Sequence, residues 1–193
     1  MEIRNAGIAD CLAIAELAQI AGDNIPGFFW ADAHQPGQSQ QATGAELLKS
    51  ETANFSYRNT LVACQDGEIT GMLLAYRLPA AEDNDEELLN FPEFVRPLIE
   101  LEQCVAESFY INMVATYPRF RGQGIASALM AEADRLAIAA RCDLISIAAF
   151  ASNPEALKLY QGLGYETVEQ RAVIACDYHP AIEVLLLTKP VVA

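Results

Sequence analysis

One stretch of the chain combines the residue types that bind phosphate, namely Val-Ala-Thr-Tyr-Pro-Arg-Phe-Arg-Gly-Gln-Gly-Ile-Ala over residues 114–126. The pattern predicts a strand, a short loop that contains Gly122 and Gly124, and a long helix that begins directly after the loop. A helix N-terminus presents unpaired N–H groups and a partial positive charge, which together bind anions. Glycine lets a phosphate approach the backbone without a Cβ in the way, and Arg119 and Arg121 add positive charge. The loop therefore predicts phosphate binding, with a plain strand-to-helix turn as the alternative.

Two common phosphate-binding loops fit this stretch poorly. A P-loop requires Gly-Lys-Ser/Thr, whereas Gly124 is followed by Ile125 and Ala126. The dinucleotide fingerprint GxGxxG matches at Gly122 and Gly124, but Ser127 takes the place of the third glycine. That fingerprint also needs an acidic residue at the end of the next strand to hold a ribose hydroxyl, and none is present there. A different type of loop is favoured.

A third loop type fits best. The run Arg-Gly-Gln-Gly-Ile-Ala at 121–126 resembles the (Gln/Arg)-x-x-Gly-x-(Gly/Ala) loop of the GNAT superfamily, the Gcn5-related N-acetyltransferases. Further along, Asn-Pro-Glu-Ala-Leu-Lys-Leu-Tyr-Gln-Gly-Leu-Gly-Tyr at 153–165 resembles the second signature of that superfamily, Asn-x-x-Ala-x-x-(Leu/Phe)-Tyr-x-x-x-Gly-(Phe/Tyr). The resemblance covers roughly residues 109–166.

The resemblance implies acetyl-coenzyme A as the acetyl donor. It implies that the pyrophosphate lies on the backbone amides of the loop, that a strand backbone pairs with the pantetheine arm, and that Asn153 binds the pantetheine amide region. The implied cofactor-binding residues are Val114, Ala115, Thr116, Arg121, Gly122, Gln123, Gly124, Ile125, Ala126, Ser127, Asn153 and Tyr160. Tyr160 also stands where the superfamily commonly has a general acid for the departing thiolate, although a tyrosine that only packs on the sheet is the alternative.

Acetyl transfer to an amine needs a base, because a primary amine has a pKa near ~10.4 and must lose a proton before it attacks a thioester. The Glu that many GNAT members carry on the fourth strand falls here at Asn112, which cannot serve as a base. Glu107 and Glu102 lie at and before the head of that strand, and we expect either to act through water. The alternative for each is a solvated surface acid.

The resemblance also implies an acceptor pocket, which superfamily members build at two places. Phe28, Phe29 and Trp30 supply aromatic surface, and residues 82–107 carry nine acidic residues opposed only by Arg96. An acidic, aromatic-lined cleft attracts a cation and covers its alkyl part. The acceptor is therefore expected to be an amine, either a small molecule or a peptide. A solvated charge run beside core aromatics is the alternative.

Composition narrows the class of protein. The chain has 193 residues with 12 basic and 26 acidic side chains, so its formal charge is 12 − 26 = −14, which disfavours nucleic acid and anionic membranes as partners. Its longest apolar runs fall far short of the ~20 residues that cross a bilayer. Residues 1–4 lack the layout of a signal peptide, so a cytoplasmic location is expected. Five scattered cysteines and two histidines, His34 and His179, predict no metal site.

The expected fold is a single α/β domain over residues 1–193, with a mixed sheet and helices on its faces. The resemblance implies a largely antiparallel sheet of about seven strands. Strands are predicted at 1–5, 60–64, 69–77, 109–116, 144–150, 172–178 and 183–189; helices at 8–20, 45–50, 124–141 and 154–161; and an irregular segment at 22–41. Asp66-Gly67 predicts a tight hairpin turn between the second and third strands.

The function predicted from this pattern is transfer of an acetyl group from acetyl-coenzyme A to a primary amine, directly within a ternary complex. A module that binds or senses acyl-coenzyme A without catalysis is one alternative, and a nucleotide-binding α/β protein of another family is a second. The superfamily resemblance also makes a homodimer conceivable.

Overall fold

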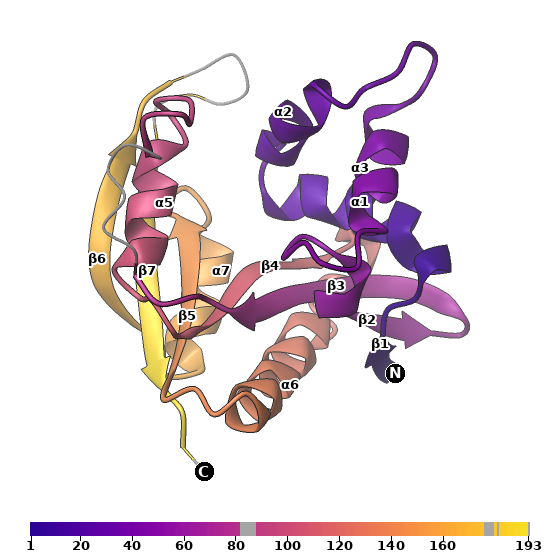
Figure 1. Cartoon of the computed structure of the whole chain (residues 1–193). Coiled ribbons are helices and arrows are strands. Elements are labelled where there is room, and N and C mark those ends of the chain that lie inside the picture. The colour runs from indigo at the N-terminus through magenta and orange to yellow at the C-terminus, as the bar shows by residue number, and fades with distance from the viewer. Residues whose placement is uncertain (82–87, 176–179, 181, 193) are drawn as a thin grey trace. The chain divides into compact units, whose positions relative to one another are not determined.

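A computed structural model covers the whole chain and describes residues 1–81, 88–175, 180 and 182–192 (Figure 1). Seven strands follow the order β1-β2-β3-β4-β5-β7-β6, and the sheet is mostly antiparallel, as predicted. The chain divides into two compact units, of which the first contains residues 1–76 and 112–133 and the second residues 77–111 and 134–193.

Three antiparallel strands begin the first unit: β1 (Glu2–Asn5), β2 (Thr60–Gln65) and β3 (Glu68–Arg77). The hairpin between β2 and β3 turns at Asp66 and Gly67, which both have positive φ, at 51° and 81°. A two-residue turn with positive φ at both positions matches the twist of a hairpin and favours Asp-Gly. The hairpin predicted from the Asp-Gly pair is therefore confirmed.

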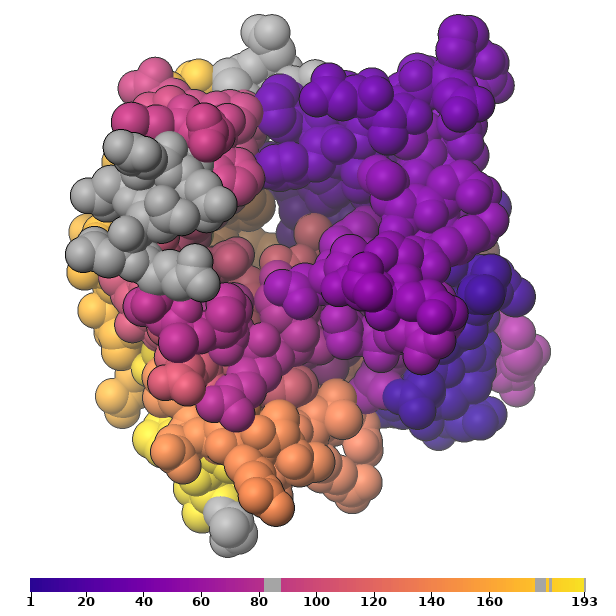
Figure 2. All heavy atoms as spheres, in the orientation of Figure 1, coloured from indigo at the N-terminus to yellow at the C-terminus, as the bar shows by residue number. Residues whose placement is uncertain are grey.

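Helices α1 (Cys11–Ala21), α2 (Ile25–Ala31) and α3 (Gln40–Leu48) pack against one another in the first unit. The prediction of an irregular segment over 22–41 is wrong for α2, because Pro26 lies in the first turn, where its missing N–H costs no helical hydrogen bond. The core of this unit gathers apolar side chains of the helices and strands, including Ile14, Leu17, Trp30, Leu48, Val62 and Met72. In the space-filling view the indigo and purple atoms of these segments form a continuous surface (Figure 2).

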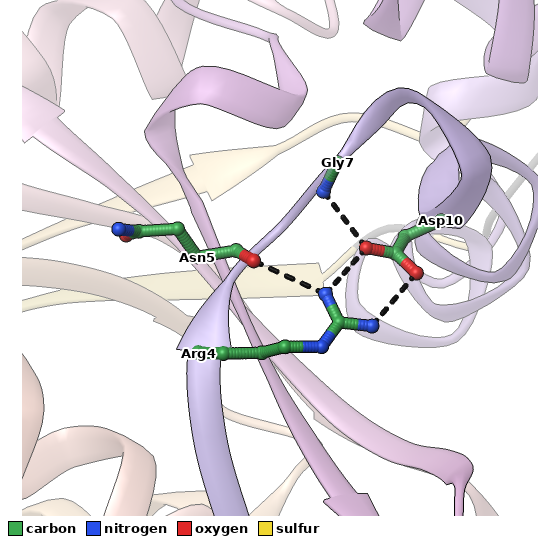
Figure 3. A network of polar contacts seen from close by, with 4 residues as sticks. All are labelled: Arg4, Asn5, Gly7 and Asp10. Atoms are coloured by element: carbon green, nitrogen blue, oxygen red, sulfur yellow. Dashed lines mark hydrogen bonds and ion pairs between the residues drawn. The ribbon is translucent and has the colours of Figure 1, made fainter.

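A polar network ties β1 to the start of α1 (Figure 3). The Arg4 guanidinium donates two hydrogen bonds to the Asp10 carboxylate, at 2.6 and 3.0 Å, and a third to the Asn5 carbonyl at 3.1 Å. The Gly7 N–H also donates to Asp10, at 2.8 Å. The hydrogen bonds from Arg4 and Gly7 hold the pKa of Asp10 below its usual value.

We expect Asp10→Asn to lower the free energy of unfolding at neutral pH by about 1 kcal/mol, a value reduced for solvent screening because Arg4 is partly exposed. The lowered pKa of Asp10 means that its contribution is present above pH of about 4 and is lost as the pH falls through the folded-state pKa. Urea unfolding from pH 7 to pH 3 measures both effects. Glu46→Gln is the control, since Glu46 pairs with Lys49 at the surface and should change stability by only a few tenths of a kcal/mol.

The second unit contains β5 (Leu144–Phe150), β7 (Ile182–Pro190) and β6 (Glu166–Val173) side by side. Residues 109–111 of β4 (Phe109–Thr116) pair with β5 in parallel. The strand predicted over 172–178 instead begins at Glu166. Apolar patterning missed it because β6 is an edge strand with polar, exposed residues, as edge strands commonly are. Residues 176–178 of that prediction lie outside the described part of the chain, as does His179.

Helix α5 (Arg96–Gln103) packs against β6, and α7 (Pro154–Gly162) connects β5 to β6. Both helices have proline in the first turn, where it is tolerated. Helix α6 (Ile125–Ala139) begins in the first unit and ends in the second.

Within the described residues, no helix is long and apolar enough to cross a membrane. The same part of the chain contains no cluster of three or more His, Cys, Asp or Glu side chains arranged to hold a metal ion.

Candidate functional site

The glycine loop of the first unit adopts an open, strongly turned conformation. Strand β4 ends at Thr116, a short 3-10 helix covers Pro118–Phe120, and α6 begins at Ile125. Gly122 and Gly124 have φ of 73° and 78°, in the left-handed region that favours glycine. A Cβ on either residue would meet no other atom within 4 Å, so the glycines leave the loop backbone open on its outer side.

A third glycine, Gly71 on β3, allows the end of β4 to lie unusually close. A Cβ at this position would fall 2.7 Å from the Ala115 carbonyl oxygen and 3.0 Å from Cγ2 of Ile125, the first residue of α6. The Tyr117 N–H donates to the Thr70 carbonyl at 3.0 Å. A glycine inside a strand signals such a close approach, so Gly71 is a further sequence signal for the position of the end of β4. These contacts hold the end of β4 close to β3 at Ala115 and Thr116, two of the three residues expected to pair with pantetheine.

The loop carries one positive charge that nothing in the described chain neutralises. Arg119 is paired with Glu68 and lies over the Phe120 ring, at 4.9 Å from its centroid. Arg121 is exposed and forms no ion pair with any described residue. In a chain with a charge of −14, an unpaired arginine beside a helix N-terminus fits a phosphate group.

A pocket of about 730 Å³ beside the loop is poorly suited to bind phosphate. Its lining includes Arg4 and Arg119 together with the acidic side chains of Asp10, Glu16 and Glu68. Both arginines are already paired, with Asp10 and Glu68. The Tyr117 hydroxyl donates to Glu16 at 2.6 Å, and burial raises the pKa of Tyr117. The pocket therefore offers an anion no free positive charge, in contrast to the loop at Arg121.

In the second unit, Asn153 caps α7. Its side-chain oxygen Oδ1 accepts the Ala156 N–H at 3.1 Å, which satisfies one of the unpaired donors of the first turn. The amide group Nδ2 remains as a donor. Asn153 can therefore keep the helix end in place through Oδ1 and donate to a ligand carbonyl through Nδ2.

Asn153→Asp separates these two roles, because the carboxylate keeps the capping oxygen and removes the N–H donor. We expect this variant to unfold at a temperature within a few degrees of the wild type and to bind acetyl-coenzyme A about tenfold more weakly. Thermal unfolding and isothermal titration measure the two effects. Asn153→Ala is the comparison that should lose both. Equal coenzyme affinity in the wild type and Asn153→Asp would contradict a ligand role for Nδ2.

Tyr160 lies in the last turn of α7 and is 6% exposed. Its ring lies 6.2 Å from that of Tyr165, centroid to centroid. Burial raises the pKa of Tyr160 to about 12, so its hydroxyl stays protonated at neutral pH. A protonated phenol can donate a proton to a thiolate, as the sequence analysis expected of this residue. Tyr165, the last residue of the second signature, has a buried hydroxyl without a hydrogen-bond partner among the described residues.

The two candidate bases differ sharply in environment. Glu107 has a side chain that is 62% exposed and is paired with Arg77 at 3.1 Å. Glu102 lies in the last turn of α5, and its burial raises its pKa to about 7, while a hydrogen bond from Tyr110 opposes the rise. A carboxylate with a pKa near neutrality can accept and release a proton at physiological pH. Of the two candidates, Glu102 is therefore the one whose pKa suits proton transfer near neutral pH.

The aromatic residues proposed for the acceptor lie on α2 and face different surroundings. Trp30 is 3% exposed and packs in the core of the first unit, 6.1 Å from the Phe55 ring. Phe29 is 47% exposed and meets Phe28 edge to face at 5.4 Å. An acceptor can therefore reach Phe29 but not the Trp30 ring. Of the acidic stretch 82–107, residues 82–87 lie outside the described part of the chain.

Residues 25–165, more than half of the chain, match the model of a family described as the acetyltransferase (GNAT) family. No curated protein matches the chain. Among solved structures, an N-acetyltransferase from Staphylococcus aureus Mu50 is 22% identical, with a TM-score of 0.63 and coverage of 98% of this chain and 100% of that one. A Drosophila melanogaster polyamine N-acetyltransferase that forms N-acetylagmatine is 15% identical, with a TM-score of 0.69 and coverage of 98% and 99%. A putative acetyltransferase from Salmonella typhimurium, solved with its cofactor acetyl-CoA, is 16% identical, with a TM-score of 0.61 and coverage of 98% and 93%.

Proposed function

Since the chain belongs to the GNAT family and is an acetyl-CoA-dependent acetyltransferase, we propose that it acetylates a primary amine by direct transfer in a ternary complex. The acceptor is a small molecule or a peptide amine. A charge of −14 draws a cationic amine toward the protein. The polyamine N-acetyltransferase among the structures of the same fold provides a precedent for such an acceptor.

The donor is proposed to bind through backbone and side-chain groups of both signatures. Backbone amides of residues 121–126 hold the pyrophosphate, with Ser127 beside them, and Arg121 adds a charge-assisted contact. The backbone of residues 114–116 pairs with pantetheine as an added strand would. The Asn153 amide donates to a pantetheine carbonyl. When bound, acetyl-coenzyme A supplies an acetyl group on a thioester, which an amine can attack.

The chemistry is assigned to two residues of the second unit. The Glu102 carboxylate accepts the proton of the amine, directly or through a water molecule. The Tyr160 hydroxyl donates a proton to the departing thiolate. The observation that carries this assignment is the contrast between Glu102, whose pKa is raised to about 7 by burial, and Tyr160, whose pKa is raised to about 12. Two groups with pKa values this far apart suit a base and an acid at the same pH.

The experiment compares amines with matched alcohols, with free coenzyme thiol as the readout. We expect thiol release to depend on a primary amine and to give intersecting lines when both substrates are varied, as direct transfer requires. Parallel lines would contradict direct transfer, because they indicate a covalent acetyl-enzyme. Coenzyme binding without thiol release in the presence of any amine would instead support a non-catalytic coenzyme-binding module, for which Asn112 in place of the usual Glu is the favouring observation. Cytoplasmic location and a homodimer stay predictions.

A further inference from the structure

Strand β6 leaves one side of the sheet open in the second unit. It is the last strand in the order of the sheet, and every pairing that it forms within the described residues is with β7 (Figure 1). The register shifts between Thr167 and Glu169, so the regular part of the open edge runs from Glu169 to Val173. An open edge presents backbone donors and acceptors that another strand can bind.

The backbone of Gln170 shows where these donors and acceptors lie. Its N–H donates to the Glu169 carboxylate at 2.9 Å, and its carbonyl accepts from the Arg171 guanidinium at 2.9 Å. In an antiparallel ladder, a residue directs both of its backbone groups to the same side. Both groups of Gln170 are bound by side chains of its sequence neighbours, which places them at the open edge. A partner strand would therefore meet Gln170 as a hydrogen-bonded pair.

The side chains that bind Gln170 can be exchanged for a partner at little cost. Those of Glu169 and Arg171 are 41% and 34% exposed, and they pair with each other at 2.9 Å. Arg171 also lies 3.4 Å from Glu100 of α5. Exposed hydrogen bonds and ion pairs contribute little net free energy, because water competes for the same groups. Equivalent bonds to a second chain can therefore replace them.

The charges of this edge are complementary to a second copy of the same edge. When two copies pair antiparallel about a two-fold axis at Gln170, each Glu169 lies opposite Arg171 of the partner subunit. Opposite charges directly across two strands stabilise the pair, and like charges destabilise it. An axis at Glu169 or at Arg171 would place like charges together, and an axis at Ala172 would leave both charges without a charged residue opposite. The order Glu-Gln-Arg is thus self-complementary when Gln170 faces its own copy.

We propose that the open edge of β6 is an interaction surface for a second copy of this chain, which adds its own β6 antiparallel and in register at Gln170. The Gln170 N–H of each copy donates to the Gln170 carbonyl of the other, and each Glu169 forms an ion pair with Arg171 of the partner subunit. The two sheets then continue into each other, as when a strand is added to an open edge. Val168, which is 55% exposed, and the exposed Ala172 add apolar contact beside this pair. The proposal does not depend on acetyl transfer.

The test measures self-association by sedimentation at about 100 μM, where we expect the wild type to be dimeric. Glu169→Lys and Arg171→Glu each place like charges opposite one another, so each should weaken self-association by about tenfold or more. A mixture of these two variants restores opposite charges at both positions and should form mixed dimers with an affinity within about threefold of wild type. Glu46→Lys and Lys49→Glu are the controls, because they change the net charge equally at an exposed ion pair of the first unit. A monomeric wild type, or a mixture that associates no better than its components, overturns the inference.

A cysteine cross-link locates the contact independently of the charges. Gln170→Cys brings two thiols to directly opposite positions with Cα atoms about 5.5 Å apart, within the range that a disulfide spans. Thr167→Cys, on the same strand, is the matched control, because this register places its two copies about 20 Å apart. Cys104, which is exposed, and Cys176 are replaced by Ser in both variants. We expect oxidation to cross-link Gln170→Cys and not Thr167→Cys. Equal cross-linking of both, or a dimer that does not cross-link at Gln170→Cys, overturns the inference.

Discussion

Tyr160→Phe is expected to lower kcat by about 10²- to 10³-fold and to leave the affinity for acetyl-coenzyme A unchanged. The phenylalanine ring keeps the packing against Tyr165 and removes only the hydroxyl that protonates the thiolate. Because the pKa of Tyr160 is about 12, the wild type should show no alkaline loss of kcat from this residue between pH 7 and pH 10. Steady-state kinetics and isothermal titration measure turnover and affinity separately.

Tyr165→Phe is the matched control for this variant. The two tyrosines form one buried aromatic pair, and the Tyr165 hydroxyl has no hydrogen-bond partner among the described residues. Removal of an unsatisfied buried hydroxyl costs no hydrogen bond and is expected to stabilise the fold by about 1 kcal/mol. If both variants lowered kcat equally, Tyr160 would be a packing residue and not a general acid.

Glu102→Gln is expected to lower kcat/KM by about 10²- to 10³-fold at pH 8 and to remove the acidic limb near pH 7. The same change should stabilise the fold. The folded-state pKa of Glu102 is raised, so its protonated form favours folding, and stability falls as the pH rises from about 4.3 toward 7. Glutamine has no charge to bury, so at pH 8 the variant should be more stable by up to about 3 kcal/mol.

A variant that is more stable and less active identifies a residue kept for function. Glu107→Gln is the comparison, since the sequence left Glu102 and Glu107 as equal candidates. Glu107 is exposed and paired with Arg77, so its substitution should change kcat/KM by less than about twofold. A large loss in Glu107→Gln with little change in Glu102→Gln would reverse the assignment of the base.

Much of the fold could be predicted because local patterns and final structure agree. The alanine-rich run that became α6, the apolar strands β4 and β5, and the Asp-Gly hairpin each carry their signal within a few residues. Helix α2 was not predicted, because proline breaks the interior of a helix and only the structure shows that Pro26 lies in the first turn, where proline is tolerated. Strand β6 was predicted at the wrong residues, because an edge strand needs few apolar residues and so carries a weak apolar pattern.

The candidate site, like the fold, could be predicted from the sequence only in part. The glycine loop is a backbone feature, and its sequence pattern predicts both the turn and the helix that follows. Burial, however, depends on contacts between distant segments, so the sequence could not separate Glu102 from Glu107. Nor could it place Trp30 in the core while leaving Phe29 exposed.

Isothermal titration of the wild type with acetyl-coenzyme A, and with NAD and ATP as controls, tests the central claim that residues 121–127 hold the acetyl donor. We predict micromolar affinity for the coenzyme alone. Gly124→Val should weaken it at least tenfold, because φ of 78° is unfavourable for a β-branched residue and the new side chain would occupy the open space where we propose that the pyrophosphate binds. No binding of the coenzyme by the wild type, or equal binding by Gly124→Val, would contradict the account.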